Sequence, residues 1–180
     1  IKAAQEMQAG LTDEVITAAI ADMPPQIVEL KGNTTIDKLK VRRDKLPEFA
    51  EEHYSIISKK VDIVGSNEDE QFRVERLNNE ETEVKVWTLN NKGKKKDKIY
   101  DRVFKHDETR EIRLYGLKGK DEFDVEGRVD KGMKVRIIGG PGKDDIKDKS
   151  RVSGLVKKTI IYDTKKKNDI EFGKEARNRT

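Results

Sequence analysis

The residues of this chain that could bind a ligand are two aspartates, each preceded by closely spaced glycines. Asp121 and Asp144 each lie five residues after a glycine that ends a short apolar run. Carboxylate and carbonyl oxygens are the ligands that Ca²⁺ prefers, and glycine permits the tight turns that bring carbonyls together. The sequence thus suggests a calcium site formed by both aspartates. Its backbone ligands would come from Gly116, Gly119, Gly139, Gly140 and Gly142.

These residues belong to a pattern that recurs along the chain. In each copy a short apolar run reaches a corner residue, and a single apolar residue returns seven positions later. The corners are Gly65, Gly116, Gly139 and Asp163, and the returning residues are Phe72, Phe123, Ile146 and Ile170. A repeated unit that cannot bury its apolar face alone must stack on its neighbours. The sequence therefore predicts stacked copies.

The glycine turns resemble degenerate RTX-like repeats, the nonapeptides G-G-x-G-x-D-x-U-x of calcium-binding parallel β-rolls. The third copy fits this pattern, whereas Leu117 replaces a glycine in the second copy and Glu70 stands at the aspartate position of the first. The second and third copies begin 23 residues apart, at Ile112 and Val135, which is longer than two nonapeptides. The simpler interpretation is that the glycines are corners of stacked units, the acids are solvated and no cofactor is bound.

The composition limits the classes of protein that this chain could belong to. Its length of 180 residues fits one compact domain or a modest repeat array with a helical appendage. With 41% charged and 33% hydrophobic residues it is unusually polar for a globular core, and this composition would suit a partly solvated, elongated body. Its 39 basic and 35 acidic residues are interleaved, so we do not expect nucleic acid as a partner. It has no cysteine, and no apolar run is long enough for a membrane span. Lysine runs at 94–96 and 165–167 leave polyanion binding as an alternative.

The N-terminal third has helical periodicity. Thr12 is placed to cap a helix, and the Pro24-Pro25 pair ends it. We expect a short helix over Gln26–Lys31, closed by Gly32-Asn33, and a further helix capped by one of the two threonines that follow.

We expect an α+β fold with two parts, a helical segment over residues 1–60 and a β region over residues 61–180. A hairpin insertion over residues 83–104 turns at Asn90-Asn91-Lys92-Gly93. Short strands with glycine turns fit either a solenoid-like stack of coils or a sandwich. The expected interior residues are Ile63, Phe72, Ile112, Leu114, Phe123, Val135, Ile137, Ile146, Ile160 and Ile170.

Four short segments carry a further resemblance: Leu46-Pro47 with the helix after it, Val61–Gly65, Arg113–Leu117 and Arg136–Gly140. With them, nearly the whole chain resembles the region that links a calcineurin-like metallophosphoesterase domain to a C-terminal outer-membrane β-barrel in large bacterial envelope proteins. The resemblance implies an envelope location, periplasmic or associated with the outer membrane. It also implies that the chain is part of a longer protein, whose other parts include a phosphoesterase-type hydrolase.

The resemblance brings no active site to this chain. A metallophosphoesterase needs clustered Asp, His and Asn ligands, and the sequence lacks the G-N-H type of motif that supplies them. The two histidines, His53 and His106, belong to no visible triad or metal-ligand spacing. We therefore expect a non-catalytic module that spaces or docks neighbouring domains of the same polypeptide and contacts other envelope components. The alternatives are a calcium-binding module like a β-roll and a polyanion-binding module that uses the lysine-rich turns.

Overall fold

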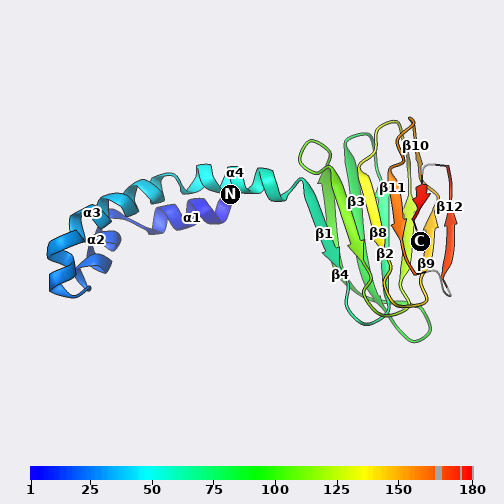
Figure 1. The fold of residues 1–180 in the computed structure, drawn as a ribbon, viewed down its shortest axis with the longest axis horizontal. Coiled ribbons are helices and arrows are strands. Elements are labelled where there is room, and N and C mark those ends of the chain that lie inside the picture. The colour runs from blue at the N-terminus through cyan, green and yellow to red at the C-terminus, as the bar shows by residue number, and fades with distance from the viewer. Residues whose placement is uncertain (165–167, 175, 180) are drawn as a thin grey trace. The chain divides into compact units, whose positions relative to one another are not determined.

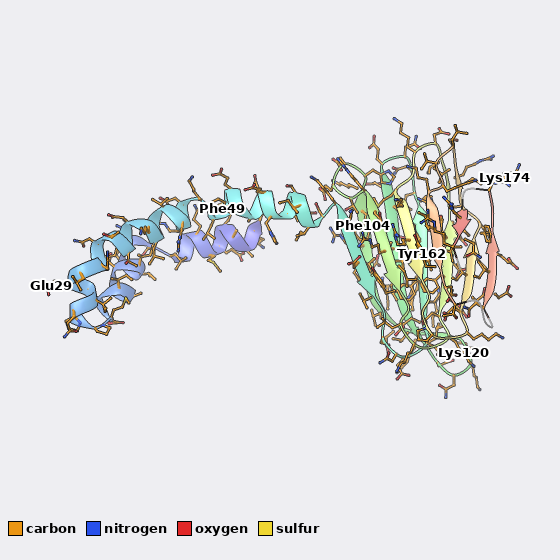
Figure 2. The ribbon with its side chains drawn as sticks, viewed as in Figure 1. Glu29, Phe49, Phe104, Lys120, Tyr162 and Lys174 are labelled. Atoms are coloured by element: carbon orange, nitrogen blue, oxygen red, sulfur yellow. The ribbon has the colours of Figure 1, made fainter. Side chains whose placement is uncertain are left out.

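The computed structural model describes residues 1–164, 168–174 and 176–179 (Figure 1). The chain divides into two compact units, a helical unit (Ile1–Ile57) and a β unit (Ser58–Thr180). Figure 2 shows the side chains of both units, with Glu29 and Phe49 labelled on the first and Phe104 and Tyr162 on the second.

The helices are α1 (Lys2–Gly10), α2 (Asp13–Ala21), α3 (Pro25–Asp44) and α4 (Leu46–Ile57). The predicted cap of α2 is confirmed, because the Thr12 hydroxyl accepts a hydrogen bond of 3.3 Å from the backbone N–H of Val15. Among the described residues, no helix is long and apolar enough to cross a membrane.

The prediction of two helices between residues 26 and 46 was wrong, because α3 runs through Gly32-Asn33 without a break. Gly32 is buried, and a Cβ atom built on it would lie 3.2 Å from Val28 and 3.7 Å from Ile20 of α2. Gly32 therefore lies in the contact between α3 and α2, and the tightest contact of an added Cβ would be with Val28 of its own helix. Thr35 does not cap a new helix, because its hydroxyl donates to the carbonyl of Lys31 one turn earlier.

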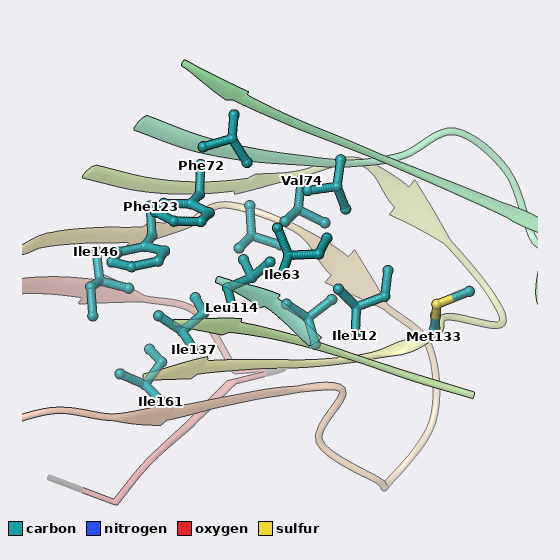
Figure 3. Packing of buried hydrophobic residues seen from close by; sticks show 14 of the residues in the cluster. Ile63, Phe72, Val74, Ile112, Leu114, Phe123, Met133, Ile137, Ile146 and Ile161 are labelled. Carbon is teal, nitrogen blue, oxygen red and sulfur yellow. The ribbon is translucent and has the colours of Figure 1, made fainter. Parts of the chain in front are cut away.

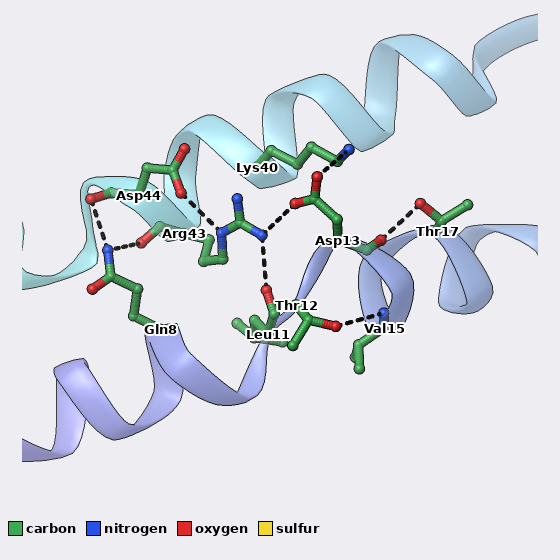
Figure 4. A network of polar contacts seen from close by, with 9 residues as sticks. All are labelled: Gln8, Leu11, Thr12, Asp13, Val15, Thr17, Lys40, Arg43 and Asp44. Atoms are coloured by element: carbon green, nitrogen blue, oxygen red, sulfur yellow. Dashed lines mark hydrogen bonds and ion pairs between the residues drawn. The ribbon is translucent and has the colours of Figure 1, made fainter.

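Polar contacts join the turn between α1 and α2 to the C-terminal end of α3 (Figure 4). Arg43 donates to the Leu11 carbonyl at 3.0 Å and to Asp13 at 2.6 Å. Lys40 also pairs with Asp13, at 2.8 Å. Within residues 1–57, all of which are described, Ile16 and Ile20 are the hydrophobic residues with buried side chains. This polar network links the turn between α1 and α2 to α3, and its partly exposed ion pairs add little stability each.

The β unit consists of short strands. They are β1 (Lys60–Val64), β2 (Glu70–Arg76), β3 (Glu81–Leu89), β4 (Lys95–Lys105), β5 (Glu111–Tyr115), β6 (Glu122–Glu126), β7 (Arg128–Val129), β8 (Lys134–Ile138), β9 (Asp145–Asp148), β10 (Arg151–Val152), β11 (Thr159–Tyr162), β12 (Asp169–Phe172) and β13 (Ala176–Asn178). The hairpin strands β3 and β4 each extend beyond the predicted limits of 83 and 104.

Two sheets hold most of these strands. The five-stranded sheet has the order β1-β5-β8-β11-β13, and all its neighbours are parallel. The six-stranded sheet has the order β12-β9-β6-β2-β3-β4. Among its described strands, β3 pairs antiparallel with both β2 and β4, and the other neighbours are parallel. A two-stranded sheet pairs β7 with β10. The predicted α+β class is confirmed.

The copies of the repeated pattern pair in register. In the five-stranded sheet Ile63 lies opposite Leu114, which lies opposite Ile137 and then Ile161. In the six-stranded sheet the returning residues Phe72, Phe123, Ile146 and Ile170 line up in the same way. Each copy therefore contributes one strand to each sheet, and equivalent residues of successive copies pair in both sheets.

The inward side chains of both sheets form one hydrophobic core (Figure 3). Phe72 and Phe123 stack within it, with ring centroids 4.8 Å apart and planes inclined by 12°. The predicted interior residue Ile160 is buried, at 9% exposure, but it lies outside the central cluster. Ile161 packs in the cluster, because Ile160 pairs with Arg136 on the other side of the sheet.

We predict that Phe123→Ala lowers the free energy of unfolding by about 3–5 kcal/mol, because it removes a fully buried ring and leaves a cavity against Phe72. Urea denaturation followed by circular dichroism measures this change. Phe172→Ala is the matched control, because Phe172 lies in the same sheet but is 45% exposed. If both variants lowered the free energy of unfolding equally, the placement of Phe123 in the core and of Phe172 outside it would be contradicted.

Candidate functional site

The predicted ligands Asp121 and Asp144 lie in a ladder of hydrogen bonds at one corner of the stack. We call Glu70, Asp121, Asp144 and Asn168 the corner ladder. Asp121 Oδ1 accepts from the backbone N–H of Glu70 at 2.9 Å, and Asp144 Oδ1 accepts from the N–H of Asp121 at 3.0 Å. Asn168 Oδ1 accepts from the N–H of Asp144 at 3.0 Å. Each side chain therefore binds the backbone of the preceding copy at the equivalent position.

The sequence predicted Asp121 and Asp144 as a pair, and the structure brings them together in adjacent copies. The proposed site did not include Glu70 and Asn168. A simple signal could have found them, because each lies five residues after its own corner, Gly65 or Asp163. The equivalence is thus visible once the copies are aligned on their corners.

The acidic side chains of the ladder are almost completely buried. Glu70, Asp121 and Asp144 are 0%, 1% and 2% exposed. Both carboxylate oxygens of Glu70 accept hydrogen bonds from Ser66, one from its backbone N–H and one from its hydroxyl. The Oδ2 atoms of Asp121 and Asp144 are buried and have no hydrogen-bond partner among the described residues. In each of these two aspartates, therefore, one carboxylate oxygen accepts a hydrogen bond and the other accepts none from the described residues.

The glycines at the corners make room for these carboxylates. A Cβ atom on Gly116 would lie 2.4 Å from Asp121 Oδ2 and 2.6 Å from the carbonyl oxygen of Gly139. A Cβ atom on Gly139 would lie 2.6 Å from Asp144 Oδ2 and 2.8 Å from Asp163 Oδ1. Gly116 and Gly139 are thus required by close packing at the corner, where a methyl group would displace a carboxylate.

The remaining predicted glycines also stack on one another. Gly119 pairs with Gly142 in an isolated parallel bridge. Gly140 has a φ of 108°, in the left-handed region, and a Cβ atom on it would lie 2.1 Å from the Leu117 carbonyl oxygen. A residue with a side chain would be excluded here both by conformation and by contact. The five predicted glycines therefore form the wall of the corner that carries the ladder.

Burial and repulsion shift the titration of the corner carboxylates. Burial is the main reason why the pKa of Asp121 rises to about 8, and the nearby charges of Asp144 and Glu70 add to it. Burial also raises the pKa of Asp144. The pKa of Asp163 rises to about 6, again mainly through burial and with a contribution from Asp144. The corner therefore favours bound protons, or another positive charge, near neutral pH.

Calcium would need more ligands than the paired aspartates provide. Ca²⁺ takes six to eight oxygen ligands. The available oxygens at this corner are Oδ2 of Asp121, Asp144 and Asp163, together with backbone carbonyls. In the part of the chain that the structure describes, no group of three or more His, Cys, Asp or Glu residues is arranged to hold a metal ion. The oxygen atoms at this corner are of the types that calcium prefers. Their arrangement, however, is that of closely packed side chains and backbone.

The other polar features of the sequence lie elsewhere. His106 Nε2 lies 3.1 Å from the Thr82 hydroxyl, and burial lowers its pKa. Lys94, Lys95 and Lys96 are exposed at the hairpin turn, where the Lys95 ammonium lies 3.7 Å from the ring centroid of Trp87. The second lysine run, 165–167, lies outside the described residues.

No protein-family model, curated protein or solved structure matched this chain.

We predict that Asp121→Asn raises the melting temperature at pH 8 and leaves it nearly unchanged at pH 4. The folded pKa of about 8 lies above the ordinary value of 3.8, so stability from this group is complete below pH 4 and is lost as the pH rises towards 8. Asparagine keeps the acceptor for the Glu70 N–H and removes the charge, as Asn168 already does in the last copy. Thermal unfolding across this pH range measures the difference.

Asp169→Asn is the control for that experiment. Asp169 is exposed and lies one residue after the ladder position. Its melting curve should stay parallel to that of the wild type at every pH. A constant difference between Asp121→Asn and the wild type from pH 4 to pH 8 would show that Asp121 is ionised in the folded protein.

Proposed function

We propose that this chain is a non-catalytic module that spaces or docks neighbouring domains of a larger bacterial envelope protein. We further propose that its β unit is a solenoid-like stack of coils. The corner ladder is the observation that supports this function best. It ties the backbone of each copy to the next at a fixed height, which makes the stack a rigid element of defined length.

The pairing of the strands supports the same role. Parallel strands in register place equivalent residues of neighbouring copies about 4.8 Å apart. Asp62, Arg113, Arg136, Ile160 and Arg177 form one such column along the five-stranded sheet. A stack of this kind holds its two ends at a separation set by the number of copies. That property suits a spacer between domains.

The envelope location rests on the sequence resemblance. It extends over both units, from Leu46-Pro47 in the helical unit to Arg136–Gly140 in the β unit. In this proposal a metallophosphoesterase-type domain elsewhere in the same polypeptide carries the catalytic residues. The neighbouring domains of that polypeptide are then the main partners of this module.

We predict that spin labels on Asp62→Cys and Arg177→Cys give one narrow distance distribution. The two positions lie four strands apart in one column, so their Cα atoms should be about 19 Å apart. The chain has no cysteine, so the introduced pair is labelled uniquely. Double electron–electron resonance on labelled protein diluted with unlabelled protein measures the distance within one chain.

The same labelled protein in concentrated urea is the control, and it should give a broad distribution. A broad or multiple distribution from the folded protein would overturn the role as a rigid spacer, because the two ends of the stack would then move independently.

A calcium-binding module is the second candidate. The buried and unpartnered Oδ2 atoms of Asp121 and Asp144 favour it, because they lie beside glycine carbonyls at the corner. If calcium binds there, millimolar Ca²⁺ should raise the melting temperature by several degrees relative to EDTA, since a ligand of the folded state stabilises that state. Mg²⁺ should have no such effect, and Asp144→Asn should remove the shift. Equal melting in Ca²⁺ and EDTA would contradict this candidate and leave the spacing role unaffected.

A further inference from the structure

The outward face of the five-stranded sheet is basic. Its side chains alternate with those of the core, so residues that flank the buried ones along each strand point outward. The acidic residues on this face are Asp62 and Glu111 among the described strand residues. The basic residues are more numerous: Lys60, Lys134, Arg113, Arg136 and Arg177.

One buried carboxylate organises this basic face. Arg113 and Arg136 donate to Glu111 Oε1 at 3.0 and 2.8 Å, and Lys134 lies 3.6 Å from Glu111 Oε2. Arg136 also donates to the Tyr162 hydroxyl at 3.2 Å. Three cations therefore share one carboxylate, so the face keeps an excess of positive charge and holds its arginines in defined positions.

The outward face of the six-stranded sheet is acidic along its parallel strands. On these parallel strands the described basic residues are Arg73 and Lys147, which pair with acids on the same face. The antiparallel strand β3 adds Lys85, which pairs with Glu83. Burial raises the pKa of Glu122, and the charges of Asp124 and Asp145 raise it further, which reflects incomplete neutralisation. The acidic residues of this face are Glu75, Glu122, Asp124, Glu126, Asp145, Asp169 and Glu171.

The two faces share one spacing. Glu122, Asp145 and Asp169 follow one another on adjacent strands of the six-stranded sheet. Arg113 and Arg136 do the same on the five-stranded sheet, in a column that begins at Asp62 and continues through Ile160 to Arg177. Both columns belong to parallel strands in register, so both repeat about every 4.8 Å. Rows of opposite charge with the same period can face one another along their length.

We propose that the basic face of the five-stranded sheet docks on the acidic face of the six-stranded sheet of a second copy of this chain. A flexible polyanion would satisfy the basic face alone. A second copy satisfies both faces, and it brings acids at the same period as the arginines. This contact joins different surfaces of the two copies, so each added copy leaves one basic and one acidic face free.

This inference goes beyond the spacing role, which needs no self-association. The two tests are therefore independent. A narrow distance between spin labels can support the rigid spacer when no association is found, and association can be found when the distance distribution is broad.

The first test is sedimentation velocity of the wild-type chain at about 20 mM and about 500 mM NaCl. We expect dimers and larger species at low salt and monomers at high salt, because salt screens contacts between exposed charges. A wild-type chain that remains monomeric at low salt and high protein concentration overturns the proposal.

Two variants reverse one face each. Lys60→Glu with Arg177→Glu alters the basic face, and Asp169→Lys with Glu171→Lys alters the acidic face. All four residues are exposed, so the fold should tolerate the changes, and circular dichroism checks this. Each variant alone should be monomeric at low salt, with association weakened about tenfold or more.

An equimolar mixture of the two variants gives the decisive result. The first variant keeps its acidic face and the second keeps its basic face, so the mixture should form a dimer with one copy of each. Two outcomes overturn the proposal: a mixture that stays monomeric, or variants that associate as strongly as the wild type. Binding of the wild-type chain to heparin without any self-association also overturns it and assigns the basic face to a polyanion.

Discussion

The structure of the β unit depends on the hydrogen bonds that join equivalent residues of successive copies. At the corner, the side chain of one copy accepts the backbone N–H of the copy before it, from Glu70 through Asp144 to Asn168. This contact keeps the copies in register at the point where the chain leaves one sheet for the other. The buried rings of Phe72 and Phe123 can stack only because that register is maintained.

The corner ladder has an electrostatic cost. Asp121 and Asp144 are buried with one carboxylate oxygen unpartnered among the described residues, and burial is the main cause of their raised pKa values. Asparagine would make the same hydrogen bond to the backbone without this cost, and the last copy uses it at Asn168. The retention of two aspartates therefore couples the stability of the stack to protons or cations near the corner.

The two units rely on different interactions. The β unit has a continuous hydrophobic core shared by two sheets. The helical unit buries Ile16 and Ile20, keeps other apolar residues only partly buried, and has a polar network centred on Arg43 and Asp13. A unit with so little buried apolar surface gains less from folding alone. The larger hydrophobic core accordingly belongs to the β unit, which also carries the two charged faces.

Several features of this protein followed from the sequence alone. The change from helical to strand periodicity predicted an α+β fold, and the spacing of corners and returning residues predicted which side chains line up. The pairing of Asp121 with Asp144 was also predicted, because both lie five residues after a corner glycine. These features are local or repeat at a fixed interval, so they are visible without any knowledge of contacts.

Other features were decided only by the tertiary structure. Gly32 continues a helix instead of ending one, because α2 packs against it, and the glycine alone does not reveal that neighbour. Ile161 joins the central cluster because it pairs with Ile137, whereas Ile160 is buried outside that cluster, opposite Arg136. The opposite charges of the two outward faces are hidden in an interleaved sequence. They separate only when the turns place alternate strands in different sheets.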